Sequence, residues 1–275
     1  MFAVIAGTGY TGRRVLAQLA ADESLGLGRT PIDTDRPFTQ IDFDTVEYLG
    51  VALPDHYVVL YTCPPDGAGD ERLARFLSAL PHPPARFVYI STTGVYGDCL
   101  GAVVTEESPV KPDNRLSRPR VDAERRLAKW AGDTGCQLII LRVPGIYGPG
   151  RLGLDRIETG EAYLKEAEAN PGNRIHVDDL VACCLAAMRE TTPPGIYNVG
   201  DGDHRSGTWF ADEVARQAGL PEPPKVSRGE AAKIFSPMRL AFLASSRIVD
   251  TTRMRDVLGI VPRTPEDGIS DSLKR

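Results

Sequence analysis

The first dozen residues constrain the fold of this 275-residue chain more than any other stretch. Residues Phe2–Ala6 form a short apolar run with the length and branching of a buried β-strand. The segment Gly7-Thr8-Gly9-Tyr10-Thr11-Gly12 follows directly, and an amphipathic stretch comes next, with Val15, Leu16 and Leu19 on one face. A strand, a Gly-x-Gly-x-x-Gly segment and a helix in this order provide the context that a dinucleotide-binding fingerprint requires.

Each glycine in this segment has its own task in such a fingerprint. Gly7 permits the tight turn, Gly9 lets the backbone approach a pyrophosphate, and Gly12 lets the helix pack closely on the strand. Free N–H groups at the start of the helix then face the phosphates. We therefore expect all six residues from Gly7 to Gly12 to bind a dinucleotide. The alternative is a structural glycine turn in an α/β protein that binds no nucleotide.

The composition argues against several other classes of protein. A net charge of −5, mixed along the chain, gives no reason to expect a nucleic-acid partner. The five cysteines are odd in number and no pair has metal-ligand spacing, so we expect no metal site and reduced thiols in a cytoplasmic protein. We also expect no signal peptide and no contact with a membrane, because no apolar run approaches the ~20 residues of a membrane span.

Apolar runs and helical patterns alternate through the first half of the chain. The runs that we interpret as further strands are Ser24–Pro31, Phe38–Asp42, His56–Tyr61 and Arg86–Ile90. Leucine and phenylalanine recur at helical spacing between residues 73 and 80. This alternation predicts an α/β fold, a Rossmann-type doubly wound parallel sheet with helices on both faces.

The end of the second expected strand bears on the choice of cofactor. In a dinucleotide-binding fold this position faces the adenosine ribose, where an acidic residue suits NAD and an arginine suits the 2′-phosphate of NADP. Arg29 stands at about the expected distance after Gly12, so we favour NADP; NAD and a merely solvated Arg29 are the alternatives. Asp42 and the Cys63-Pro64 pair end the next two strands, and we place them in the cofactor site as well.

Hydroxyl groups gather at the end of the fifth expected strand, in Ser91-Thr92-Thr93-Gly94-Val95-Tyr96-Gly97-Asp98. Ligands of open α/β sheets bind beyond the carboxyl ends of the strands, so Thr92 and Thr93 are in position to contact a nicotinamide ring or a substrate. The alternative is a Ser/Thr turn in which these hydroxyls satisfy their own backbone.

Five segments of the chain resemble the extended short-chain dehydrogenase/reductases, the group of nucleotide-sugar epimerases and dehydratases. They are Ser91–Asp98, Leu138–Gly150, Arg174–Leu180, Gly195–Gly200 and Thr252–Gly259, in the order and at the spacing of that family. The resemblance implies an NAD(P)-binding Rossmann core over residues 1–150. Residues 151–275 would then complete the sheet at about 176–200 and form a small C-terminal cap that binds the substrate.

Within the family, the residue four positions before the tyrosine of Val-Tyr-Gly supplies a catalytic hydroxyl. That residue is Thr92, so the resemblance implies that Thr92 orients the substrate oxygen. Tyr96 is the nearest phenol and the alternative acid, although the family usually uses this position for packing.

The sixth expected strand, which starts at Leu138, brings further candidates to the same edge of the sheet. Pro144 belongs to the expected cofactor site, and Tyr147 and Arg151 follow the strand as candidates for the substrate pocket. His176 is another substrate candidate, although a lone histidine at a helix start is more often a cap or a hydrogen-bond partner.

One departure from the family bears directly on chemistry. The family uses Tyr-x-x-x-Lys on the helix after strand five, where the tyrosine is the acid and base and the lysine lowers its pKa. Alignment on Glu124 puts Leu116 at the tyrosine position and Arg120 at the lysine position. Leu116 can donate no proton, whereas Arg120 can still hold a ribose or a pyrophosphate. This pattern resembles the atypical, YeeZ-like branch of the superfamily.

Two functions of different classes fit these observations. The first is an NADP-dependent oxidoreductase or epimerase-like enzyme with a small-molecule, sugar-like substrate, present as a monomer or homodimer. The second is a nucleotide-binding sensor or regulatory scaffold that retains the fold and has lost catalysis. The fold alone does not choose between them.

Overall fold

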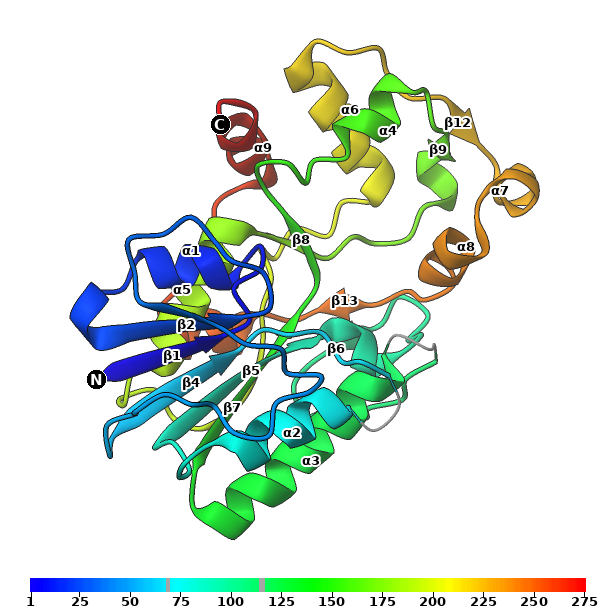
Figure 1. Cartoon of the computed structure of the whole chain (residues 1–275). Coiled ribbons are helices and arrows are strands. Elements are labelled where there is room, and N and C mark those ends of the chain that lie inside the picture. The colour runs from blue at the N-terminus through cyan, green and yellow to red at the C-terminus, as the bar shows by residue number, and fades with distance from the viewer. Residues whose placement is uncertain (68–69, 114–116) are drawn as a thin grey trace.

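A seven-stranded parallel sheet forms the centre of the computed structural model, which describes residues 1–67, 70–113 and 117–275. Its strands lie in the order β11-β7-β5-β4-β1-β2-β3 (Figure 1). Their bounds are β1 Phe2–Ala6, β2 Ser24–Gly28, β3 Phe38–Gln40, β4 Tyr57–Tyr61, β5 Arg86–Thr92, β7 Gln137–Val143 and β11 Gly195–Asn198. Each neighbouring pair is parallel, which confirms the expected doubly wound α/β fold.

The order of the strands reverses next to β1. The chain runs from β1 outward to β2 and β3, and then crosses to β4 on the other side of β1. In open sheets of this kind, ligands bind beyond the carboxyl ends of the strands at the point of reversal. The carboxyl ends of β1, β4 and β5 therefore mark the place where a functional site is expected.

Several strand ends differ from the expected ones. β2 and β3 end at Gly28 and Gln40, before the expected ends. Beyond β3 the chain turns, and the Asp42 carboxylate accepts the N–H of Asp44 at 3.0 Å. β5 continues to Thr92, so this residue belongs to the strand and not to the turn that follows it.

Helices cover both faces of the sheet (Figure 1). α1 Gly12–Ala17 and α5 Val177–Met188 share one apolar core with the sheet, and α2 Glu71–Ala79 and α3 Arg118–Thr134 share the other. Pro119 lies in the first turn of α3, where its missing N–H removes no helical hydrogen bond. Among the described helices, none is long and apolar enough to cross a bilayer.

A smaller unit, which we call the cap, lies beyond the carboxyl ends of the strands (Figure 1). Its helices are α4 Leu154–Glu158, α6 Gly207–Ala218, α7 Arg228–Ile234, α8 Pro237–Leu243 and α9 Pro265–Leu273. Pro237 begins α8 and so separates it from α7, as the interrupted helical pattern in the sequence indicates. Apolar side chains of α4, α6 and α9 form one small core in the cap, and those around α7 form another.

Short elements complete the structure. Three parallel pairs lie outside the main sheet: β8 Gly145–Tyr147 with β10 Arg174–His176, β9 Tyr163–Leu164 with β12 Lys225–Val226, and β6 Val103–Val104 with β13 Ile248–Val249. Helical turns lie at η1 Ala21–Glu23, η2 Thr93–Tyr96, η3 Glu166–Glu168 and η4 Met254–Leu258. Gly259 ends η4 in the left-handed region, as expected for a C-cap glycine.

Candidate active site

The glycine turn connects β1 to α1 where the strand order reverses. Gly7 has a φ of 99°, and its N–H donates to the carbonyl oxygen of Leu27 at 2.8 Å. A Cβ on Gly12 would overlap the carbonyl oxygen of Gly7, so only glycine lets α1 pack this closely on β1. A Cβ on Gly9 would meet no atom within 4 Å. The turn therefore leaves open space at Gly9, where the fingerprint places a pyrophosphate.

Residues of β2 and of the loop after β4 pack against this turn. The Thr62 hydroxyl donates to the carbonyl oxygen of Gly7 at 2.6 Å. Cys63 packs against the same glycine, and burial raises the pKa of its thiol to about 12, so the thiol stays neutral. Gly28 lies so close to Thr8 that a Cβ on it would overlap the Thr8 hydroxyl. The end of β2 is thereby fixed directly beside the turn.

Tyr10 of the glycine turn lies between two arginines that have no carboxylate partner among the described residues. Its ring centroid is 4.0 Å from the guanidinium carbon of Arg14 and 3.9 Å from that of Arg151. Its hydroxyl donates to the carbonyl oxygen of Pro149 at 3.0 Å. The turn after β8, at Gly148, folds the chain back onto Tyr10. The structure thus places Arg151 beside the glycine turn, and its contact with a substrate stays a prediction.

The end of β2 carries an arginine, as the sequence indicates, but this arginine has an acidic neighbour. The side chain of Arg29 is 70% exposed, and its Nη1 lies 3.5 Å from Oδ2 of Asp44. Asp44 is also bound by Arg72 from the start of α2. Asp42 precedes this group, and its carboxylate holds the backbone of Asp44. Sequence reasoning missed Asp44 and Arg72, because they are 28 residues apart and belong to no motif.

A cleft of about 990 Å³ lies between the carboxyl edge of the sheet and the cap. Its sheet wall consists of the loop after β4, the end of β5 and the start of α3, and its cap wall includes α8 and β9. The expected site residues that line it are Pro64, Thr92, Thr93, Arg120, Pro144 and Tyr147. The expected residues that do not line it are Gly7–Gly12 of the glycine turn, Arg29, Asp42, Cys63, Tyr96, Arg151 and His176.

Hydroxyl groups line the sheet wall of this cleft. The Thr92 hydroxyl accepts the N–H of Gly94 at 3.1 Å, so the Ser/Thr turn that we considered as an alternative does occur. The same hydroxyl keeps its own proton for donation to a ligand. Ser117 also lines the cleft, and its Oγ lies 2.6 Å from the position that a Cβ on Gly94 would take. Ser117 was missed because no motif marks it.

Arg120 lies at the base of the cleft. Its Nη1 donates to the carbonyl oxygen of Ile90 at 2.7 Å and to the Tyr89 hydroxyl at 3.1 Å. These contacts fix the guanidinium at the carboxyl end of β5, and the carbonyl oxygen of Cys63 lies 3.5 Å away at the end of β4. The position is compatible with a group that holds the ribose of a cofactor. Leu116, which the sequence alignment places at the tyrosine position, lies outside the described residues.

Tyr96 is buried behind the cleft in a network of polar side chains. Its hydroxyl donates to Oδ1 of Asn198 at 2.6 Å and accepts Nη1 of Arg142 at 3.0 Å. Arg142 forms a buried ion pair with Glu124 at 2.7 Å, and Glu124 also accepts the Ser91 hydroxyl at 2.5 Å. Burial raises the pKa of Tyr96. These contacts are those of a packed structural residue, and the alternative in which Tyr96 is the acid stays a prediction.

Polar atoms of two expected substrate residues, His176 and Tyr147, face α9 and not the cleft. His176 is fully buried; its Nδ1 accepts the N–H of Asp178 at 3.1 Å, and its Nε2 lies 3.1 Å from the Ser272 hydroxyl. Its side chain thus caps α5, and its contact with a substrate stays a prediction. Tyr147 lines the cleft, but its hydroxyl is buried against Gly268 of α9 without a hydrogen-bond partner among the described residues. Burial raises the pKa of this phenol, so it stays protonated.

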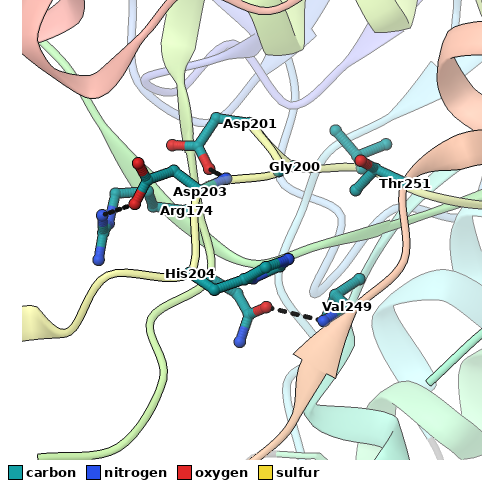
Figure 2. A pocket seen from close by; sticks show the side chains of 10 residues that line it. Arg174, Gly200, Asp201, Asp203, His204, Val249 and Thr251 are labelled. Carbon is teal, nitrogen blue, oxygen red and sulfur yellow. Dashed lines mark hydrogen bonds and ion pairs between the residues drawn. The ribbon is translucent and has the colours of Figure 1, made fainter. Parts of the chain in front are cut away.

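Charged residues of the loop after β11 form the junction between the sheet and the cap (Figure 2). The N–H of Asp201 donates to the carbonyl oxygen of Arg174 at 2.8 Å, and Oδ1 of Asp201 accepts the N–H of Asp203 at 2.9 Å. Oδ2 of Asp201 is buried with no hydrogen-bond partner among the described residues. Burial raises the pKa of Asp201 to about 7.

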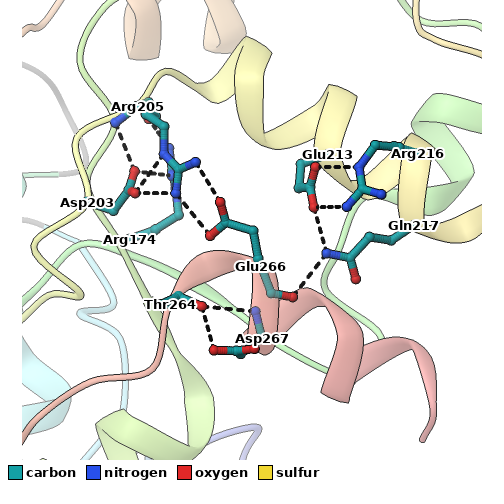
Figure 3. A network of polar contacts seen from close by, with 9 residues as sticks. All are labelled: Arg174, Asp203, Arg205, Glu213, Arg216, Gln217, Thr264, Glu266 and Asp267. Atoms are coloured by element: carbon teal, nitrogen blue, oxygen red, sulfur yellow. Dashed lines mark hydrogen bonds and ion pairs between the residues drawn. The ribbon is translucent and has the colours of Figure 1, made fainter.

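Ion pairs extend from this junction to the C-terminal helix (Figure 3). Arg205 binds Asp203 and reaches Glu266 of α9 at 2.6 Å. Arg174 lies 3.3 Å from Asp203 and lines the cleft. No local sequence pattern marks this network, because Arg205 and Glu266 are 61 residues apart.

A glycine turn on the first strand of a doubly wound parallel sheet, with a cleft at the point of reversal, defines a dinucleotide-binding protein of the Rossmann class. Residues 60–200 match the NAD dependent epimerase/dehydratase family, and the chain belongs to this family. Membership indicates a nicotinamide dinucleotide as the cofactor.

Similar proteins agree with this assignment. The chain is 29% identical over 184 residues to the protein YeeZ of Escherichia coli K12, a match that spans 63% of this chain and 63% of YeeZ, less than two thirds of either. It confirms the resemblance to the YeeZ-like branch. The solved structure of a functionally unknown conserved protein from Silicibacter pomeroyi has a TM-score of 0.78 at 26% identity, over 100% of this chain and 99% of that one.

A UDP-glucuronic acid 4-epimerase from Bacillus cereus, solved in complex with NAD, shares the fold at greater distance. Its TM-score is 0.74 at 15% identity, over 100% of this chain and 99% of that one. At this level of identity the likeness concerns the fold alone.

Proposed function

We propose that the chain is an NADP-preferring oxidoreductase of the epimerase/dehydratase type that acts on a small, sugar-like molecule. The observation that carries the proposal is the cleft at the point of strand reversal, which brings the Thr92 hydroxyl and the Arg120 guanidinium to one wall. The sugar-like substrate is suggested by the family and by the name of the Bacillus cereus epimerase.

The cofactor part of the proposal is supported by residues along the carboxyl edge of the sheet. Gly9 leaves space for the pyrophosphate, and Arg29 stands where the 2′-phosphate of NADP would lie. Arg120 would hold the nicotinamide ribose in place of the family's lysine, and Pro64 and Pro144 would flank the ring. When bound, the cofactor supplies the group that gives or takes a hydride.

The chemical part of the proposal assigns one orienting group. The Thr92 hydroxyl would donate a hydrogen bond to the substrate oxygen and stabilise the charge that builds on it. Thr92 is not the main acid, because the pKa of an alcohol is too high without a partner base. Leu116 stands at the tyrosine position of the sequence pattern, so a water molecule or a substrate group would carry the proton.

A second candidate function is a nucleotide-binding sensor or scaffold without turnover. The sequence pattern with Leu116 and Arg120 in place of the tyrosine and lysine favours it. The fold is equally compatible with both functions.

Stopped-flow fluorescence of bound NADPH, with a panel of sugar-like and other small carbonyl compounds, separates the two functions. Oxidation of NADPH by a member of the panel supports the enzyme. Binding of NADPH without turnover across the panel supports the sensor. Absence of NADPH and NADH binding contradicts both.

We further propose that residues 1–150 form the cofactor-binding unit, and that residues 151–275 complete the sheet and provide the substrate cap. The contribution of β11 to the sheet and of α6, α7 and α8 to the cap supports this division. A cytoplasmic location is consistent with five cysteines that are all free thiols.

A further inference from the structure

Three charged side chains from three different elements meet at the ribose end of the proposed cofactor site. Arg29 follows β2, Asp44 follows β3, and Arg72 lies in the first turn of α2. Oδ2 of Asp44 lies 3.5 Å from Nη1 of Arg29 and 2.9 Å from Nη2 of Arg72. The same carboxylate therefore lies within reach of both arginines.

Arg72 binds Asp44 more closely, and with more hydrogen bonds, than Arg29 does. Arg72 binds it with two hydrogen bonds, from Nε to Oδ1 at 2.6 Å and from Nη2 to Oδ2 at 2.9 Å, in the fork geometry that guanidinium and carboxylate favour. Its remaining Nη1 donates to the carbonyl oxygen of Pro64 at 2.9 Å, and its side chain is only 19% exposed. Arg29 has a single long contact and a side chain that is 70% exposed. Asp44 is thus primarily the partner of Arg72.

The balance of charge at this place depends on Arg72. The hydrogen bonds from Arg72 lower the pKa of Asp44, so the carboxylate is ionised at neutral pH. With Arg72 present, Arg29, Asp44 and Arg72 carry a net charge of +1; without it, Arg29 and Asp44 cancel. Asp42, Asp66 and Arg75 also lie close to these three: Asp42 holds the backbone of Asp44, Asp66 accepts the backbone N–H of Arg72 at 3.1 Å, and Arg75 lowers the pKa of Asp44 further.

We propose that Arg72 is a positioning residue for the choice of cofactor: it holds and neutralises Asp44, which leaves Arg29 available to the 2′-phosphate of NADP. Arg72 acts through Asp44 and does not itself touch the nucleotide. This inference rests on the NADP preference in the proposed function.

The test measures dissociation constants of NADPH and NADH by titration calorimetry for the full-length protein, at low and at physiological salt. The ratio of the two constants is the readout, because a purely structural role of Arg72 weakens both nucleotides alike. The variants are Arg72→Met, Asp44→Asn, the double variant, Arg72→Lys and Arg29→Ala. Arg216→Met, which breaks the Arg216–Glu213 pair on α6, is the matched control.

Arg72→Met is expected to reduce the preference for NADPH about three- to tenfold, because the freed Asp44 neutralises Arg29 beside a phosphate of nearly two negative charges. Asp44→Asn is expected to increase the preference, and the double variant to return toward the wild-type ratio. Arg72→Lys keeps the charge and is expected to restore part of the preference. The effects shrink at higher salt, and Arg216→Met leaves the ratio unchanged.

The experiment distinguishes failure of the proposed NADP preference from failure of the proposed role of Arg72. If Arg29→Ala leaves the ratio unchanged, the proposed NADP preference is wrong, and this inference falls with it. If Arg29→Ala removes the preference but Arg72→Met and Asp44→Asn leave the ratio unchanged, only the role of Arg72 is wrong. Equal weakening of both nucleotides by Arg72→Met, without recovery in the double variant, also overturns the inference.

Discussion

The two walls of the cleft are held by different forces. The sheet wall stands on two continuous apolar cores, and the glycine turn, at the carboxyl end of β1 in the same sheet, has backbone contacts that leave no room for a side chain at Gly12. The cap wall has two small apolar clusters and depends on ion pairs between distant residues, such as Arg205 with Glu266 at 2.6 Å and Arg239 with Glu161 at 3.3 Å.

In the proposed function, this difference separates binding of the cofactor from selection of the substrate. Apolar packing and backbone shape respond little to salt and pH, whereas partly exposed ion pairs are weakened by both. Changes of salt or pH, and substitutions in the cap, that leave the sheet and its glycine turn intact should therefore still alter the structure of the cap.

The largest effect is expected within the glycine turn at the carboxyl end of β1. Gly12→Val should destabilise the fold by about 3 kcal/mol or more, because its side chain meets the backbone of Gly7. Gly9→Val projects into open space, so the protein should fold normally and lose its thermal stabilisation by NADPH and NADH. Thermal unfolding followed by circular dichroism, with and without nucleotide, checks both variants. If the Gly9→Val protein still binds NADPH or NADH, the pyrophosphate does not bind at Gly9.

The next effect concerns the chemistry of the sheet wall, once turnover is found. Thr92→Val should lower kcat about 10²- to 10³-fold, as loss of a hydrogen bond to a developing oxyanion does. Tyr96→Phe should change kcat little, because the phenol is buried behind the cleft. Arg120→Ala should mainly weaken nucleotide binding. Steady-state kinetics distinguish the roles of Thr92 and Tyr96. If Tyr96→Phe is inactive while Thr92→Val keeps its kcat, the Tyr96 phenol is the acid.

A third effect tests the junction of the cap with the sheet. Burial raises the pKa of Asp201 to about 7 in the folded protein. Between about pH 4 and pH 7 the folded state holds a proton that the unfolded chain releases, so this contribution to stability falls as pH rises through that window.

Asp201→Asn should therefore flatten the loss of stability above pH 5 and raise the free energy of unfolding at pH 8 by about 2 kcal/mol. Urea unfolding at pH 5, 6, 7 and 8 measures the change. Asp203→Asn, which breaks ion pairs with Arg174 and Arg205, should instead lower stability and serves as the control. An Asp201→Asn protein whose stability follows the wild-type pH profile would contradict the assignment.

The smallest effect distinguishes the two nucleotides. NADPH should raise the melting temperature of the wild-type protein more than NADH does at equal concentration, because Arg29 meets the 2′-phosphate. Arg29→Ala should remove this difference, which corresponds to about a tenfold change in affinity for an exposed charge pair. Differential scanning fluorimetry over a range of concentrations gives the comparison, and equal shifts in the wild type would count against NADP.

Local patterns predicted the strands of the central sheet and the glycine turn well, because strand length and glycine spacing are properties of neighbouring residues. They do not predict a side-chain direction that depends on distant parts of the chain. Arg151 is turned toward Tyr10 by the loop at Gly148, and the Tyr147 hydroxyl is buried by a helix that comes more than a hundred residues later. The partners of the cap network are equally remote, so no pattern in the sequence could have paired them.

The buried network of Ser91, Glu124, Arg142 and Tyr96 has a consequence for how such a chain can diverge. It joins β5, α3 and β7, and loss of one charged partner leaves the other buried and uncompensated, which costs about 3–5 kcal/mol. Single substitutions there are strongly disfavoured, whereas exposed cap pairs can be exchanged one at a time at little cost. If the cap binds the substrate as proposed, new substrates are therefore most readily acquired through substitutions in the cap, while this network in the sheet stays unchanged.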